Sequence, residues 1–137
     1  MRGVSPLFGN PEKKAQKEAE LTAARAETDR LLGLSPPALA AEVLPDAFGA
    51  SGPKVVAGTR GLNVFQVAMA VTDKNPRGTT YLKELVEPIR EALQVLEHAE
   101  LILRNTNQDQ GARYTLTRLG QATLADGTVA EKLHAAG

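Results

Sequence analysis

The 137-residue chain is long enough for one domain with an accessory segment, and its 16 basic residues balance 16 acidic ones, which disfavours strong nucleic-acid binding. It has no cysteine, which excludes disulfides, thiolate metal sites and cysteine nucleophiles. Because 42% of the residues are hydrophobic but only 4% are aromatic, Leu, Val and Ala must fill the core, which favours a helical fold.

The apolar segments indicate where the protein acts. Residues 1–8 lack the apolar run of a signal peptide. The richest apolar stretch, residues 62–71, is broken by Asn63 and Gln66 and is too short to span a bilayer. We therefore expect a cytoplasmic protein with no membrane partner.

Residues 11–32 predict a helix that stands apart from the rest of the chain. Asn10 can cap it, Pro11 suits its first turn, and Gly33 suits its exit. Its charges are mixed, and its apolar face is expected to hold mainly small side chains: Ala15, Ala19, Thr22 and Ala26, followed by Leu31 and Leu32. Since alanine buries little area, this helix is either a solvated arm or an element that orders against a partner, including a homodimer partner.

A second helix is expected from Ser35 onward, where the serine can cap it and two prolines suit its first turn. Pro45 is expected to kink or end this helix. Residues 49–61 are rich in Gly, Ser, Pro and basic residues, and only Val55 and Val56 indicate a short strand there. The expected buried stripe of the second helix is Leu39, Ala40, Val43 and Leu44.

Residues 62–73 predict a short helix with a strong start signal. Asn63 and Gln66 can form a capping box, and Leu62 can pack on Val67 as a hydrophobic staple. Residues 75–78 predict a turn. The expected apolar face of this helix consists of Val64, Val67, Ala68 and Val71, widened by Phe65 and Met69.

Residues 80–99 predict a longer amphipathic helix. Pro88 lies inside it, so the segment either breaks into two helices near Glu87 or forms one kinked helix. The expected buried face follows the helical repeat: Leu82, Leu85, Val86, Ile89, Leu93 and Leu96.

After residue 100 the pattern predicts a hairpin, with strands at residues 101–104 and 113–116 and a polar tip between them. Leu101 and Leu103 are expected on one face of the first strand, and Tyr114 and Leu116 on one face of the second. Thr117 can cap a helix that Gly127 ends, and residues 128–131 can cap a short tail helix.

A long amphipathic helix, a hairpin and a closing helix in this order resemble a winged-helix domain. The segment Leu96-Glu97-His98-Ala99-Glu100-Leu101-Ile102 resembles the helix-end motif of bacterial MarR-like regulators, which reads Leu-Glu, two residues, Gly-Leu-Ile. Tyr114-Thr115-Leu116-Thr117-Arg118-Leu119-Gly120 matches the pattern Tyr-x-Leu-Thr-x-x-Gly at every fixed position. The resemblance covers residues 93–124 well and 36–124 more loosely.

The resemblance implies a mostly α fold with a small antiparallel β-hairpin. It predicts a charged N-terminal helical arm at 1–34, a winged-helix domain at 35–127 and a short helical tail at 128–137. It also implies a DNA-binding transcriptional regulator whose partner is double-stranded DNA. The candidate nucleic-acid-binding residues are basic side chains of the long helix, the hairpin and the turn: Arg77, Lys83, Arg90, Arg104, Arg113 and Arg118.

Two departures from the family pattern bear on this expectation. Glu100 stands where the family has glycine, at a position that often takes the left-handed conformation at a cost of about 1 kcal/mol. The helix of residues 82–100 carries five glutamates against Lys83 and Arg90, which opposes contact with phosphates. The alternative is a non-enzymatic protein–protein interaction module, in which this acidic helix docks a basic partner and the N-terminal arm assists.

No catalytic centre is expected. His98 and His134 are the only histidines, and His98 falls near a helix end, where a capping role is favoured over catalysis. No histidine pair or close acidic cluster has metal-ligand spacing, and residues 49–54 lack the spacing of a phosphate loop. We therefore predict a protein that is not an enzyme and binds no metal or cofactor.

Overall fold

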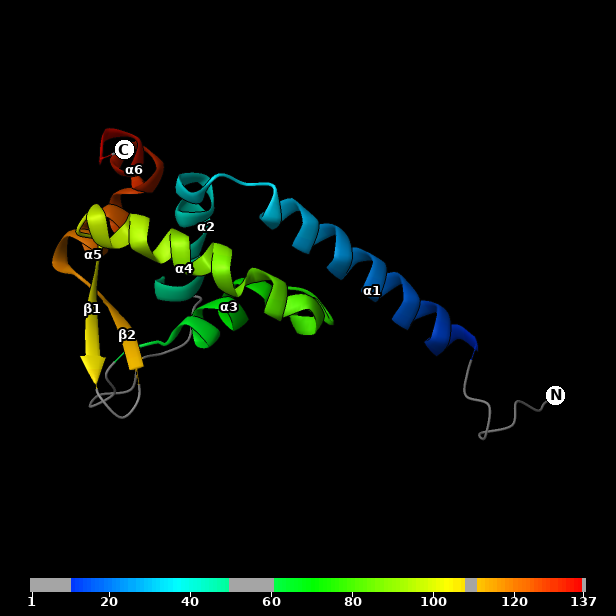
Figure 1. Ribbon diagram of the computed structural model, residues 1–137. Helices are drawn as coiled ribbons and strands as arrows, with labels where there is room; N and C mark the ends of the chain where they lie inside the picture. Colours follow the sequence, from blue (N-terminus) through cyan, green and yellow to red (C-terminus); the bar gives the residue numbers. More distant parts are fainter. Residues whose placement is uncertain (1–10, 50–60, 108–110, 137) are drawn as a thin grey trace.

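The computed structural model of the chain describes residues 11–49, 61–107 and 111–136. The protein is mostly helical with one small antiparallel hairpin, which confirms the expected fold class (Figure 1). The elements in chain order are α1 Pro11–Leu32, α2 Pro36–Phe48, α3 Val64–Thr72, the 3-10 helix η2 Gly78–Tyr81, α4 Leu82–His98, β1 Ile102–Asn107, β2 Gly111–Leu116, α5 Arg118–Asp126 and α6 Val129–Ala136.

The expected cap of α1 at Asn10, the strand at Val55 and Val56, and part of the hairpin tip lie outside the described residues. In the described part of the chain, every helix falls short of the length and apolarity that crossing a bilayer requires. One hydrophobic core joins the elements, with contributions from Leu31 of α1 and from Val129 and Leu133 of α6. The division of the chain at residues 34 and 127 stays a prediction.

Helix α1 packs on the body through its residues from Glu20 onward. Its side chains at residues 11–19 are exposed, and Figure 1 shows this end leaning away from the other helices. The expected face of Ala15, Ala19, Thr22 and Ala26 is wrong, because these residues are exposed. The buried residues are Ala24, Thr28 and Leu31, which face η2 and α4. Alanines occur on more than one side of α1, so the sequence shows no single apolar stripe. The elements that pack against the helix therefore determine which face is buried.

Helix α2 begins as expected, with the Ser35 hydroxyl accepting the N–H of Ala38 at 3.3 Å. The helix continues through Pro45 to Phe48, so of the two outcomes expected at this proline, a kink or an end, the end is not observed. Proline removes a single backbone donor, and the buried side chains on both sides of Pro45 keep the helix on the core. Gly49 ends the helix, where a Cβ would overlap the carbonyl oxygen of Pro45.

The capping box of α3 is confirmed. The N–H of Gln66 donates to the Asn63 side chain at 2.9 Å, and the N–H of Asn63 donates to the Gln66 side chain at 2.8 Å. Two residues expected in the core are not there: Phe65 is 53% exposed and Met69 is 52% exposed. The buried face of α3, made by Val67 and its neighbours, is narrow because this short helix packs mainly on α2 and α4, with a smaller contact to η2.

Helix α4 runs unbroken from Leu82 to His98 with Pro88 inside it, so the segment is one helix. The expected face is largely confirmed, although Leu82 and Val86 are only partly buried. Leucine and isoleucine packing before and after Pro88 compensates for the one backbone hydrogen bond that proline cannot make. The fully buried positions of α4 are Leu85, Ile89, Ala92, Leu93 and Leu96.

The exit of α4 takes the left-handed conformation that the family motif implies. Glu100 has φ 65°, its N–H donates to the Glu97 carbonyl at 2.9 Å, and the N–H of Leu101 donates to the Leu96 carbonyl at 3.0 Å. These two bonds form a Schellman motif. A glutamate therefore occupies a position that favours glycine.

The hairpin pairs Ile102 with Leu116 and Arg104 with Tyr114. Ile102 and Tyr114 are buried, whereas Leu103 is 56% exposed, so the expectation that Leu103 shares a face with the buried Leu101 is wrong. The strand begins one residue later than expected, and strand alternation then turns Leu103 outward. The N–H of Leu62 donates to the carbonyl of Tyr114 at 2.9 Å, and the N–H of Tyr114 donates to the carbonyl of Leu62 at 2.8 Å. This isolated antiparallel bridge places Leu62 beside β2.

Candidate nucleic-acid interface

A groove of about 570 Å³ lies between the first turn of α3, one flank of α4 and the hairpin. The lining combines charged, amide and aromatic side chains, including Phe65, Arg90, Gln94, Glu97, Arg104 and Tyr114. The capping box of α3 places Phe65 at the rim, and the β1–β2 register places Arg104 opposite Tyr114 on the strand face that borders the groove. Three elements therefore bring these side chains together.

Heptad spacing divides the exposed surface of α4 into two flanks. Residues seven apart differ by only about 20° around a helix, so Lys83, Arg90 and Glu97 lie on one flank. This flank borders the groove, since Arg90 and Glu97 line it. Glu84, Glu91 and His98 form the other flank by the same spacing, turned about 100° away.

The acidic character of α4 is therefore concentrated away from the groove. Glu84 is bound to Arg25 of α1 through two hydrogen bonds of 2.7 and 2.9 Å. Glu91 lines a second groove, formed with α2 and α6. Glu87 lies between the flanks and pairs with Arg90 at 2.9 Å. Of the five glutamates counted in the sequence, only Glu97 lines the groove beside the hairpin.

Two of the six candidate nucleic-acid-binding residues meet in this groove. Arg90 and Arg104 both line it and are both more than half exposed. Each is held by a carboxylate of α4, since Arg104 lies 3.4 Å from Glu97. Lys83 is exposed on the same flank, and among the described residues it has no ion-pair partner.

The other three candidates lie elsewhere. Arg113 is half-buried and donates a 3.0 Å hydrogen bond to the carbonyl of Gly61, while its Nε is buried without a partner among the described atoms. Arg77 has φ 58° in the turn before η2 and pairs with Glu20 of α1 at 3.2 Å. Arg118 is exposed at the start of α5. The groove therefore does not contain these three arginines.

Two groove residues were not found from the sequence. Phe65 was assigned to the core, although its place in the first turn of a short helix allows it to lie at the rim. Gln94 was not singled out, yet it follows Arg90 by one helical turn and is exposed. The i, i+4 spacing is the signal that joins these two polar side chains on one surface.

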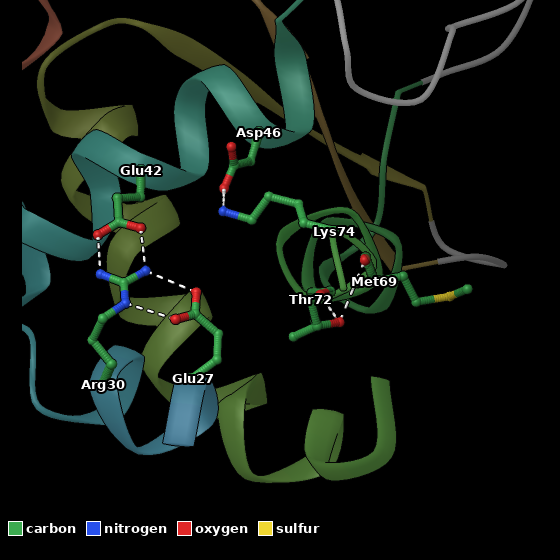
Figure 2. A network of polar contacts seen from close by, with 8 residues as sticks. Glu27, Arg30, Glu42, Asp46, Met69, Thr72 and Lys74 are labelled. Atoms are coloured by element: carbon green, nitrogen blue, oxygen red, sulfur yellow. Dashed lines mark hydrogen bonds and ion pairs between the residues drawn. The ribbon is translucent and has the colours of Figure 1, made fainter. Parts of the chain in front are cut away.

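A separate polar network joins α1, α2 and the end of α3 (Figure 2). Arg30 donates to Glu27 and Glu42 at 2.8 to 2.9 Å, and Lys74 pairs with Asp46 at 2.8 Å. The hydrogen bonds from Arg30 lower the pKa of Glu27 and the pKa of Glu42 below their ordinary range. Arg30 and Lys74 are both paired with carboxylates of α2, so this network has a structural role in holding the helices together.

The groove offers two guanidinium groups, the carboxamides of Asn63 and Gln94 and two aromatic side chains, which suit phosphates, base edges and sugar or base surfaces. Within the described ranges, no three His, Asp or Glu side chains gather in a way that could hold a metal ion. No protein-family model, curated protein or solved structure matches the chain. The functional argument therefore depends on the geometry of the groove.

Proposed function

We propose that the protein is a winged-helix nucleic-acid-binding protein, and that it acts as a DNA-binding transcriptional regulator without catalysis. The observation that carries this proposal is the groove, where Arg90 and Gln94 of α4 meet Arg104 of the hairpin. The chain order supports it, because α2, the Leu62 bridge, α3, α4 and the hairpin follow one another as in the winged-helix domains that the motifs resemble. In such domains the helix before the hairpin enters the major groove.

The side chains of the groove contact different parts of the DNA. Arg90 and Arg104 contact phosphates, and Lys83 extends the same basic flank. Gln94, flanked by these arginines, reaches base edges, where a carboxamide pairs well with adenine. Phe65 packs against sugars or a thymine methyl group. Affinity thus comes from the arginines and sequence preference from Gln94.

The local carboxylates keep this binding weak. Exposed ion pairs contribute only about 0–1 kcal/mol, so a phosphate can displace Glu87 from Arg90 or Glu97 from Arg104 at small cost. The displaced carboxylate still repels the phosphate that replaces it. We therefore expect duplex affinity that is modest and strongest at low salt.

Fluorescence anisotropy with a random-sequence duplex tests the proposal. Arg90→Gln and Arg104→Gln should each weaken binding severalfold and reduce the salt slope by about one, the value for one lost phosphate contact. Lys132→Gln, which removes an exposed cation of α6, should leave both quantities unchanged. The proposal fails if the parent protein does not bind at low salt, or if the two arginine variants bind as the parent does.

A protein-interaction module is the second candidate function, and the exposed half of α1 is the observation that favours it. Residues 11–19 form two and a half turns of helix with no buried side chain, and the acidic flank of α4 offers Glu91 to a basic partner, since Glu84 is bound to Arg25. A photo-crosslinking residue at position 15 should then trap a protein partner, or a second copy of the chain. The same residue at position 125, exposed on α5, serves as the control.

A further inference from the structure

We propose that a second groove, between the start of α2, the outer flank of α4 and α6, binds a small organic cation with an ammonium group on an apolar chain. The groove measures about 350 Å³, within the range of small-molecule sites. Its lining includes Pro36, Pro37, Glu91, Val95, His98 and Leu133. Gln94 lines both grooves, so the two sites adjoin across α4. Cation recognition here rests on Glu91 and the apolar walls, so the inference does not depend on DNA binding.

The charge of the groove selects a cation. Glu91 supplies its only carboxylate, and within the described chain this carboxylate has no ion-pair partner. Helix N-termini usually attract anions, but Pro36 and Pro37 have no N–H, and the N–H of Ala38 is taken by Ser35. The last turn of α4, at His98, adds the negative end of a helix dipole. These features offset the positive end of the α2 dipole. The full negative charge of Glu91 then makes the electrostatic potential of the groove negative.

The remaining walls suit an apolar chain. Pro36 and Pro37 form a rigid side, since their rings are fixed, and Val95 and Leu133 supply aliphatic surface from α4 and α6. Leu133 belongs to the hydrophobic core, so this wall is held in place by the packing beneath it. The carboxylate and the aliphatic surface face the same groove, so one ligand of a few carbons can reach both.

Titration of the full chain with n-hexylammonium, followed by ¹H–¹⁵N NMR, tests the inference. Saturable shifts are expected at Val95, His98 and Leu133. Hexanol, which keeps the chain but lacks the charge, should bind about threefold more weakly, as expected for one exposed ion pair. Hexanoate should bind more weakly than hexanol, because its charge has the sign of Glu91. Equal binding of the alcohol and the ammonium, or binding of hexanoate as tight as that of the ammonium, would overturn the inference.

Glu91→Gln identifies the group that recognises the cation. This exposed substitution should remove the advantage of hexylammonium over hexanol while the remaining amide spectrum stays unchanged. Glu18→Gln, which makes the same change in net charge on the exposed part of α1, should keep that advantage. If Glu18→Gln has the larger effect, the preference comes from overall charge and not from this groove.

Discussion

The hydroxyl of Thr117 donates a 2.7 Å hydrogen bond to the carbonyl oxygen of Glu100 and so joins the start of α5 to the exit of α4. The same hydroxyl oxygen accepts the N–H of Gly120 at 2.9 Å, as the cap of α5. The two motifs that carry the winged-helix resemblance are therefore in direct contact. Their fixed residues have a structural role at this junction, whatever the protein binds.

Replacing Thr117 with valine should destabilise the fold. The shape is kept, but the cap of α5 and the bond to Glu100 are both lost, which should cost about 1–2 kcal/mol. Urea denaturation measures the loss. Thr117→Ser keeps the hydroxyl and should retain most of the stability, so an equal loss in both variants would contradict a hydrogen-bonding role.

Replacing Glu100 with glycine should stabilise the fold. The left-handed conformation costs a non-glycine residue about 1–2 kcal/mol, and glycine removes this cost while adding some entropy to the unfolded chain, so a net gain of about 0.5–1 kcal/mol is expected. The control is Glu91→Gly in the exposed interior of α4, which should cost about 1 kcal/mol. Opposite signs in thermal or urea denaturation would confirm the conformational cause.

Replacing Gly120 with alanine should be costly although the residue lies in a helix. Alanine normally stabilises a helix interior by about 1 kcal/mol relative to glycine. Here a Cβ would overlap the carbonyl oxygen of Leu101, so a loss of about 2 kcal/mol or more is expected from forced movement of α5. A gain in the unfolding midpoint would show that the contact between α5 and Leu101 is looser than described. At Gly127 a Cβ meets nothing within 4 Å, so Gly127→Ala should cost only about 1 kcal/mol, from its left-handed backbone at φ 68°.

The Arg30 network should make stability depend on pH. Because Arg30 lowers the pKa of Glu27 and of Glu42, the network stabilises the fold above the unfolded glutamate pKa of about 4.3. This contribution is lost as the pH falls through the lower pKa values of the folded protein. Arg30→Gln should therefore reduce the melting temperature at pH 7 more than at pH 3. Lys13→Gln on the exposed part of α1 should shift it little at either pH.

Replacing Glu97 with glutamine should raise duplex affinity at low salt. The substitution removes the carboxylate that faces the groove and competes for Arg104, and the gain should shrink as salt screens the charges. Glu91→Gln removes the same charge from the other flank and should produce a smaller gain. Equal gains from the two variants would mean that the flanks of α4 do not differ toward DNA.

Local signals predicted the helix starts and the main core helix from sequence. The capping box at Asn63 and the Thr117 cap depend on residues three apart in the chain, so local chemistry determines them. The face of α4 was found because large leucines and isoleucine repeat along it. The left-handed conformation of Glu100 was predicted from the motif alone, since a glutamate by itself disfavours that conformation.

The errors occur where a distant contact decides the outcome. The face of α1 depends on η2, the exposure of Phe65 depends on the narrow support of α3, and Leu103 depends on where β1 begins. The candidate site was likewise predicted only in part from the sequence. Arg90 and Arg104 were named as cations, but which flank of α4 borders the hairpin follows from tertiary packing, so Gln94 was missed.

The anchoring of α1 makes this helix a rigid spacer. Each residue of the helix rises about 1.5 Å, so Pro11 lies roughly 13 Å beyond Glu20, the first residue of α1 that is partly buried. The buried residues Ala24, Thr28 and Leu31, together with the pairs Arg25–Glu84 and Arg77–Glu20, set the direction of the spacer. A fluorescent dye or a fusion partner joined at Pro11 would be held at a defined separation from the groove, and energy transfer across that separation would report bending of any DNA bound there.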